Sequence, residues 1–226
     1  MNRWLFVSLL LTILALGGPL ALYFGWTDLL KDPIPTHTNA AGEVDGWTPR
    51  DRILPQWLIF PGFMAGLLGL SLLMPWMSPK GFEIERFRET FFFLMAVVTL
   101  LLAYIHFVFV LGAVQGIQLD MSRWLLGGLS LFFSLLGNRL GKVQRNFWMG
   151  VRTPWTLASE TVWIQTHRLT AWLWVGGGLL LAILAFAGVS VWVWIAGLSV
   201  MALSPVVYSL WLYKRLEKQG KLSSTP

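Results

Sequence analysis

Six long apolar stretches constrain this chain more than any other feature of its sequence. They cover about residues 4–25, 55–77, 90–114, 122–140, 169–187 and 190–213. Each has the roughly 20 residues that an α-helix needs to cross about 30 Å of hydrocarbon. Hydrophobic residues make up 56% of the chain and charged residues only 12%, too few charges to cover a water-soluble surface. The sequence therefore predicts an all-α integral membrane protein with six transmembrane helices.

The distribution of basic residues predicts an orientation in a bacterial cytoplasmic (inner) membrane. Of the 17 Lys and Arg residues, 13 lie at the N-terminus, in segments 78–89 and 138–168, and in the C-terminal tail. Because basic loops stay on the cytoplasmic side, both termini and segment 138–168 are expected to face the cytoplasm. The first stretch lacks a small-x-small cleavage pattern, so it is expected to be a retained helix. The net charge of +6 suits contact with anionic membrane lipids, and no direct nucleic-acid partner is expected.

The sequence predicts two structural units. Residues 1–77 are expected to form a two-helix unit with an extracytoplasmic loop at 26–54. Residues 78–226 are expected to form a four-helix unit that carries the cytoplasmic loop 138–168, with a tight hairpin at 188–190. The absence of cysteine excludes disulfides, thiolate metal sites and a cysteine nucleophile, and no cofactor is expected.

His106 is the one ionisable residue in the middle of an apolar stretch. A neutral histidine can be accommodated there by donating a hydrogen bond to another helix, and this structural role is favoured. The alternative is a proton-relay or ligand-binding role, since ionisable groups at membrane depth are costly.

The loop at 26–54 contains turn-forming residues between two extended segments. Asn39, Gly42 and the Asp45-Gly46 pair predict two short arms joined by a turn. We expect a recognition loop whose ligand-binding residues are His37, Asn39, Glu43 and Asp45. The alternative is a divalent-metal or acid/base site at His37, Glu43 and Asp45, although their spacing matches no established ligand signature.

Segment 138–168 concentrates the polar chemistry of the chain. Asn138, Gly141, Lys142 and Arg145 recur at helical spacing, so a fourth helix that continued past the membrane would place them on one face. That face would meet either lipid headgroups or the rest of the loop.

The second part of this segment contains signals for a turn and a new helix. Gly150 permits a sharp change of direction, and Pro154 forces Thr153 into an extended conformation. Thr156 is then expected to cap a new helix with Glu160 in its first turn, giving a hairpin of helices under the membrane. For Arg152 an ion pair with Glu160 is favoured; a lipid phosphate, backbone carbonyls or a direct ligand contact are the alternatives.

These motifs resemble a known family. The run 137–142, followed by Asn146-Phe147, segment 150–157, Ser159-Glu160, Trp163 and Thr166-His167-Arg168, resembles the signature of the SdpI family of bacterial membrane immunity proteins. The outer loop, Ile34 to His37 and Asn39 to Gly46, separately resembles a small domain of unknown function often found at the start of such proteins.

The resemblance implies immunity to a secreted antimicrobial peptide toxin. The best-known family member protects a Bacillus from its own toxin and sequesters a cytoplasmic transcriptional repressor at the membrane. By resemblance, the partners are a peptide toxin outside and such a repressor inside. The cytoplasmic signature would then comprise Asn138, Gly141, Lys142, Asn146, Gly150, Arg152, Thr153, Pro154, Trp155, Thr156, Glu160, Trp163 and His167.

Two other classes of function stay open from the sequence. A small-molecule or peptide transporter would depend on His106 or on a polar cavity. A membrane-embedded, metal-dependent enzyme would use His37 with Glu43 or Asp45, or His167 with Glu160, but no spacing matches a known protease or hydrolase signature, so no catalytic residue is assigned.

Overall fold

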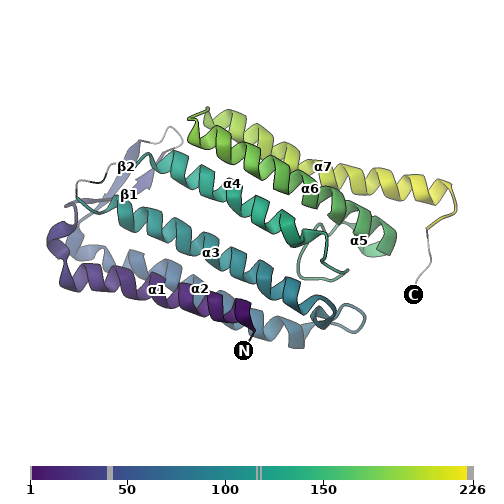
Figure 1. Ribbon diagram of the computed structural model, residues 1–226, viewed down its shortest axis with the longest axis horizontal. Helices are drawn as coiled ribbons and strands as arrows, with labels where there is room; N and C mark the ends of the chain where they lie inside the picture. The colour runs from purple at the N-terminus through teal and green to yellow at the C-terminus, as the bar shows by residue number, and fades with distance from the viewer. Residues whose placement is uncertain (1, 40–42, 116, 118, 223–226) are drawn as a thin grey trace.

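The protein is a bundle of long helices with a small β-hairpin at one end (Figure 1). The computed structural model describes residues 2–39, 43–115, 117 and 119–222. Within them the helices are α1 (Arg3–Gly25), α2 (Leu54–Met77), α3 (Arg88–Gly112), α4 (Met121–Leu140), α5 (Pro154–Ala158), α6 (Glu160–Phe186) and α7 (Val191–Lys218). The strands are β1 (Ile34–Thr38) and β2 (Val44–Thr48), and short 3₁₀ helices cover Thr27–Leu29, Arg50–Arg52 and Ile84–Phe87.

Five of the six expected membrane spans are helices long and apolar enough to cross a bilayer. In the described part of the chain they contain α1, α2, α3, α6 and α7. The sixth expected span coincides with α4, a 20-residue helix that is not among the five. Arg123 and Arg139 lie near its two ends, with several Gly and Ser residues between them. A membrane crossing by α4 therefore stays a prediction.

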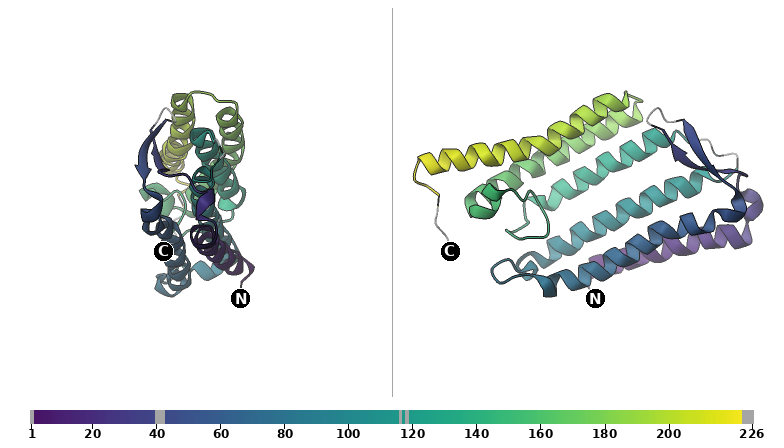
Figure 2. Two further views of the ribbon diagram at one scale, coloured as in Figure 1. Left: turned by 90° about the vertical axis from the view of Figure 1, so that its left-hand side faces the viewer. Right: turned by 180° about the vertical axis from the view of Figure 1, so that it is seen from behind.

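The long helices lie side by side, with α4 inside the bundle. α1 and α2 lie at one edge and α6 and α7 at the other, with α3 and α4 between them (Figure 2). α4 packs on α3 and, more extensively, on α6. At Gly178 the two backbones approach so closely that an added Cβ would lie 2.7 Å from the carbonyl oxygen of Ser130. The position of α4 between other helices explains how a helix of lower apolar content fits the bundle. The division of the chain at residue 77 stays a prediction.

The turn between the last two helices is as short as the sequence predicts. α6 ends at Phe186 and α7 begins at Val191. Gly188 adopts a φ of 77°, a left-handed conformation that favours glycine. The Ser190 side chain then caps α7 by accepting from the Trp192 N–H at 3.4 Å.

The expected pair of extended arms is confirmed as the antiparallel hairpin β1–β2. Of its turn, Ala40, Ala41 and Gly42 lie outside the described residues, as does the end of the tail from residue 223. A small apolar core beneath the hairpin contains Leu30, Ile34, Ile53, Trp57 and Ala113.

The segment before the hairpin is attached to the end of α3. Leu30 forms a β-bridge with Val114, and Lys31 Nζ donates to the carbonyls of Gly112 at 2.8 Å and Ile117 at 3.0 Å. The hairpin is thus held against the connection between α3 and α4.

Candidate functional site

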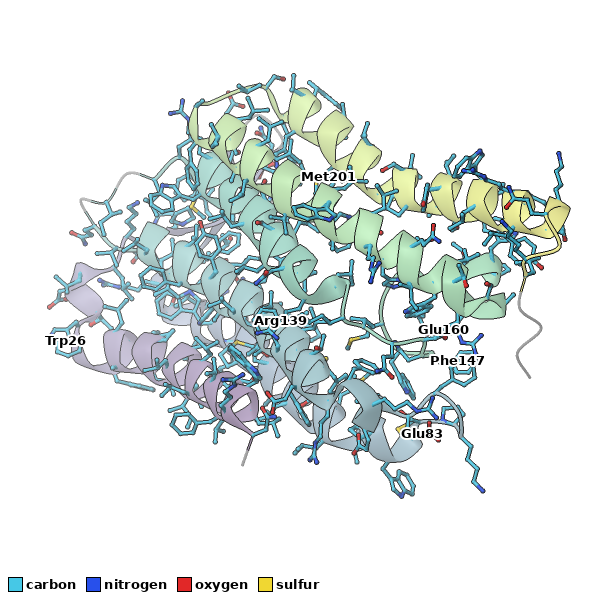
Figure 3. All side chains as sticks on the ribbon, turned by 45° about the vertical axis from the view of Figure 1, so that its right-hand side comes forward. Trp26, Glu83, Arg139, Phe147, Glu160 and Met201 are labelled. Carbon is cyan, nitrogen blue, oxygen red and sulfur yellow. The ribbon has the colours of Figure 1, made fainter. Side chains whose placement is uncertain are left out.

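The connection between α4 and α6 folds into a compact, hydrogen-bonded unit, which we call the signature junction (residues 141–159 with the first two turns of α6). It lies at the end of the bundle opposite the hairpin. Figure 3 shows Phe147 and Glu160 at this end, near Glu83 of the α2–α3 connection, and Trp26 at the other end.

Asn146 organises the loop that follows α4. Its side chain is fully buried and makes four hydrogen bonds to backbone groups. The amide donates to the carbonyls of Gln144 at 2.8 Å and Met149 at 3.2 Å, and Oδ1 accepts from the N–H groups of Trp148 at 2.7 Å and Met149 at 2.9 Å. Because both donors and both acceptor positions are used, Asn146 fixes the loop rather than presenting a polar group to a ligand.

His167 joins α6 to the loop through both ring nitrogens. Nδ1 lies 2.8 Å from the carbonyl oxygen of Trp163, and Nε2 accepts from the N–H of Val151 at 3.0 Å. A carbonyl only accepts and an amide only donates, so the geometry specifies the neutral ring with its proton on Nδ1. The ring stacks on Trp163 with centroids 4.1 Å apart, and the Trp163 indole donates to the Val143 carbonyl at 2.7 Å.

Gly150 allows the backbone of the loop to come close to the His167 ring. It adopts a φ of 105°, which confirms the expected change of direction. A Cβ at this position would lie 2.3 Å from His167 Nε2.

Thr153, rather than Thr156, caps the short helix α5, so the sequence expectation was wrong by one turn. Thr153 is extended before Pro154, as expected, and its side chain accepts from the Thr156 N–H at 3.2 Å. The Thr156 hydroxyl accepts from the Thr153 N–H at 2.9 Å, which completes a reciprocal capping box. Ser159 then caps α6, with Glu160 in the first turn as expected. The expected pair of helices reduces to the single turn of α5 followed directly by α6.

The expected ion pair between Arg152 and Glu160 is also wrong. Glu160 pairs with Arg145, whose Nε lies 3.3 Å from Oε2. Arg145 in addition donates to the Leu157 carbonyl at 3.0 Å, and it can reach Glu160 because the loop turns back beneath α6. The exposed Arg152 instead donates to the carbonyl of Phe147, one of the alternatives for this residue.

The polar strip expected on an extended fourth helix does not form. α4 ends at Leu140 with Gly141 as its C-cap, so Gly141, Lys142 and Arg145 do not continue the helical face that holds Asn138. Asn138, Lys142 and Pro154 are exposed, and Trp155 is half-buried. The exposed part of the expected signature is therefore formed by residues from separate elements.

The junction contacts the connection between α2 and α3. The Trp148 indole donates to Ser78 Oγ at 3.0 Å, and the rings of Phe147 and Phe82 lie 4.2 Å apart. In the same connection, the N–H groups of Gly81 and Glu83 and, less strongly, the charge of Arg86 lower the pKa of the Glu83 carboxyl.

Two residues that complete the junction lack a clear signal in the sequence. Ser209 of α7 lies 3.1 Å from the Thr153 hydroxyl, and it stands 56 residues further along the chain, within an apolar helix. Ser78, at the end of α2, is also far in sequence from its partner Trp148, which lies 70 residues further along the chain. Arg145 was noticed only through the helical spacing that the structure does not contain.

At the opposite end, the four expected ligand residues form two pairs. His37 contacts the carboxylate of Asp45 through Nδ1. Asn39 donates from its side chain to Glu43 Oε2 at 3.1 Å and accepts from the Glu43 N–H at 3.0 Å. Among the residues that the structure describes, no group of three or more His, Asp and Glu side chains could hold a metal ion.

The surroundings of His167 and Glu160 differ from those of a catalytic pair. His167 is fully buried with both nitrogens bonded to backbone groups, while Glu160 is engaged by Arg145. The pair proposed for catalysis at this end is therefore not joined by a hydrogen bond.

The comparisons with known proteins concern the junction and the helices that follow it. Residues 142–209 match the model of the SdpI/YfhL protein family. Immunity protein SdpI of Bacillus subtilis (strain 168) is 37% identical over 59 residues, which are 26% of this chain. The match spans 28% of that relative's length. No solved structure matches the chain.

The matched segment contains most of the residues that build the junction, from Asn146 through His167 to Ser209. Together with the five apolar helices, it identifies a multi-pass bacterial membrane protein. Within this chain, residues 142–209 are thus similar to the SdpI/YfhL protein family.

Proposed function

We propose that this protein is a membrane immunity or sensor protein that protects a bacterium from a secreted peptide toxin. The observation that carries the proposal is the match of residues 142–209 to the SdpI/YfhL family, with a relative named as an immunity protein. In this proposal the hairpin faces the outside and the signature junction faces the cytoplasm. The basic residues of the junction, the α2–α3 connection and the tail support that orientation.

α3 is the element that would couple the two ends. Near its C-terminal end, Lys31 bonds to the carbonyl of Gly112 beneath the hairpin. Near its N-terminal end, Phe91 and Phe92 share a buried core with Trp163 of the junction. A displacement of the hairpin by toxin would therefore act on a helix that packs against the junction. Such coupling requires the toxin to bind two states of the protein with different affinity.

The two groups of site residues have different roles in this proposal. His37, Asn39, Glu43 and Asp45 lie on the hairpin and would contact toxin. On the inner side, the exposed Asn138, Lys142 and Arg152 would contact a repressor or another cytoplasmic partner. The buried Asn146, Thr156, Trp163 and His167 would hold that surface in shape.

Survival of a toxin-sensitive host tests the proposal. The host would be exposed to the peptide toxin of the Bacillus family member while it produces either the unaltered protein or one of three variants. In the first variant a Gly-Ser linker replaces residues 34–48, and the second is Arg152→Gln. The third, Lys80→Gln in the α2–α3 connection, is the control. At equal membrane levels, we expect protection by the unaltered protein and by Lys80→Gln, and its loss on replacement of the hairpin. Loss of signalling to a repressor reporter, with protection retained, is expected for Arg152→Gln. No protection by the unaltered protein would contradict the proposal.

A further inference from the structure

His106 forms the interhelical hydrogen bond that the sequence predicts, but it uses one ring nitrogen only. The side chain is 3% exposed, and Nε2 lies 3.0 Å from the carbonyl oxygen of Ala15 in α1. Since that oxygen can only accept, Nε2 carries the proton, and Nδ1 of a neutral ring is a bare acceptor. No residue in the described part of the chain donates to Nδ1. An acceptor without a partner is costly in an apolar surrounding, so Nδ1 of this buried side chain favours a ligand that can donate.

His106 lies on the wall of a groove between α2 and α3. The groove has a volume of about 500 Å³, within the range of small-ligand sites. Its walls include Trp57, Ile59 and Phe60 of α2 and Phe109 of α3.

The hairpin supplies the outer rim of this groove. Pro35 and Thr36 of β1 line it together with Gln56 at the start of α2. Gln56 donates to Thr48 of β2 at 2.9 Å, and Thr36 and Thr48 lie 3.3 Å apart through their hydroxyls. The groove therefore begins with hydrogen-bonding groups under the hairpin and becomes apolar toward His106.

We propose that this groove receives an apolar segment of the peptide ligand, which donates a hydrogen bond from an N–H or O–H group to Nδ1 of His106. A lipid acyl chain would fill the space between the apolar walls equally well, but it has no donor for Nδ1 of His106. A peptide that enters beneath the hairpin offers both apolar side chains and donors. This inference rests on the proposed function, and it assigns to α2 and α3 the inner part of the toxin site.

Photo-crosslinking in native membranes tests the groove directly. A photo-reactive amino acid would replace Ile59 at the mouth of the groove, and in a second protein Leu58, an exposed neighbour on α2 that does not line it. With the Bacillus toxin as the probe, capture is expected at position 59 and not at position 58. Capture of phospholipid at position 59, unchanged by toxin, would overturn the proposal.

Substitutions can distinguish ligand binding in the groove from the structural role of His106. Ile59→Trp fills the mouth without touching the bond to Ala15, and it is expected to abolish protection, whereas Leu58→Trp is expected to retain it. His106→Phe is expected to weaken toxin binding roughly tenfold, the effect of one lost hydrogen bond, and His106→Gln, which can both donate and accept, to restore it.

Three results would overturn the inference, and they differ in what they say of the proposed function. Protection by the unaltered protein that persists in Ile59→Trp and His106→Phe would leave the proposed function standing and remove the groove from it. Loss of toxin capture only on filling the second cavity beside His106, between α1 and α3, with Leu14→Trp would place the ligand there instead. Absence of both capture and protection in the unaltered protein would reject the groove and the proposed function together.

Discussion

Gly150 is the single residue on which the contact between the signature loop and α6 depends most. Alanine at this position would need a positive φ and would place its Cβ 2.3 Å from His167 Nε2. We expect Gly150→Ala to lower the free energy of unfolding by about 1–3 kcal/mol, because the strained backbone and the displaced imidazole add. Thermal unfolding of the purified protein in detergent would measure the change.

Gly176→Ala is the matched control for this substitution. Gly176 lies in the same family segment, inside α6, where an added Cβ meets nothing within 4 Å. Alanine there is expected to be neutral or to stabilise by up to about 1 kcal/mol, since it favours the helix. Equal unfolding temperatures for the two variants would show that Gly150 is not needed for the contact with His167.

Double-mutant cycles can show which arginine of the junction pairs with Glu160. In a double-mutant cycle of Arg145→Gln and Glu160→Gln, we expect a coupling energy of about 0.5–1 kcal/mol, because Arg145 is largely enclosed and Glu160 half-exposed. The corresponding cycle of Arg152→Gln with Glu160→Gln is expected to give no coupling. Coupling in the second cycle and none in the first would show that Glu160 pairs with Arg152, as the sequence favours, and not with Arg145.

At the scale of elements, the sequence predicts local structure well and contacts across elements poorly. The hairpin, the turn at Gly188, and the extended Thr153 followed from turn formers and Pro154, whose effects are local. The apolar stretch 122–140 already ends where α4 ends, at Leu140, so the helical spacing of the polar residues through Gly141 to Arg145 does not correspond to a helical face. The contacts of Thr153 with Ser209 and of Trp148 with Ser78 depend on how distant helices pack, which no local pattern contains.

The attachment of the hairpin to α3 depends on Lys31. Its ammonium group bonds to two carbonyls just at and beyond the end of α3, and hydrogen bonds to charged groups contribute about 1.5–3 kcal/mol each. Lys31→Met should therefore raise amide exchange at Lys31 and Gln115, whose N–H groups cross between the two segments, by roughly tenfold or more. Hydrogen exchange measured by mass spectrometry is the readout, and Lys80→Met, an exposed lysine at the other end, is the control. Unchanged exchange at both positions would show that the backbone bonds alone hold the hairpin.

At the scale of the whole molecule, the open question of topology concerns α4. Successive long helices run in alternate directions, so the hairpin and the α6–α7 turn lie at one end, and the junction lies at the other (Figures 1 and 2). Because of its polar residues, α4 is not among the helices that are long and apolar enough to cross a membrane. Its place between α3 and α6 reduces its exposure to lipid, which is the usual situation of polar residues at membrane depth. We therefore expect α4 to cross the membrane as a sixth span.

Single cysteines can test this expectation cleanly, because the natural chain contains none. Trp47→Cys in the hairpin and Val189→Cys in the α6–α7 turn should react with a membrane-impermeant maleimide added to intact cells. Lys80→Cys and Lys142→Cys should react only after the cells are permeabilised, since they lie at the opposite end of the bundle. If α4 did not cross, position 142 would lie on the same side as position 47 and would react in intact cells. Position 80 serves as the internal control, because α2 alone separates it from the hairpin, whichever course α4 takes.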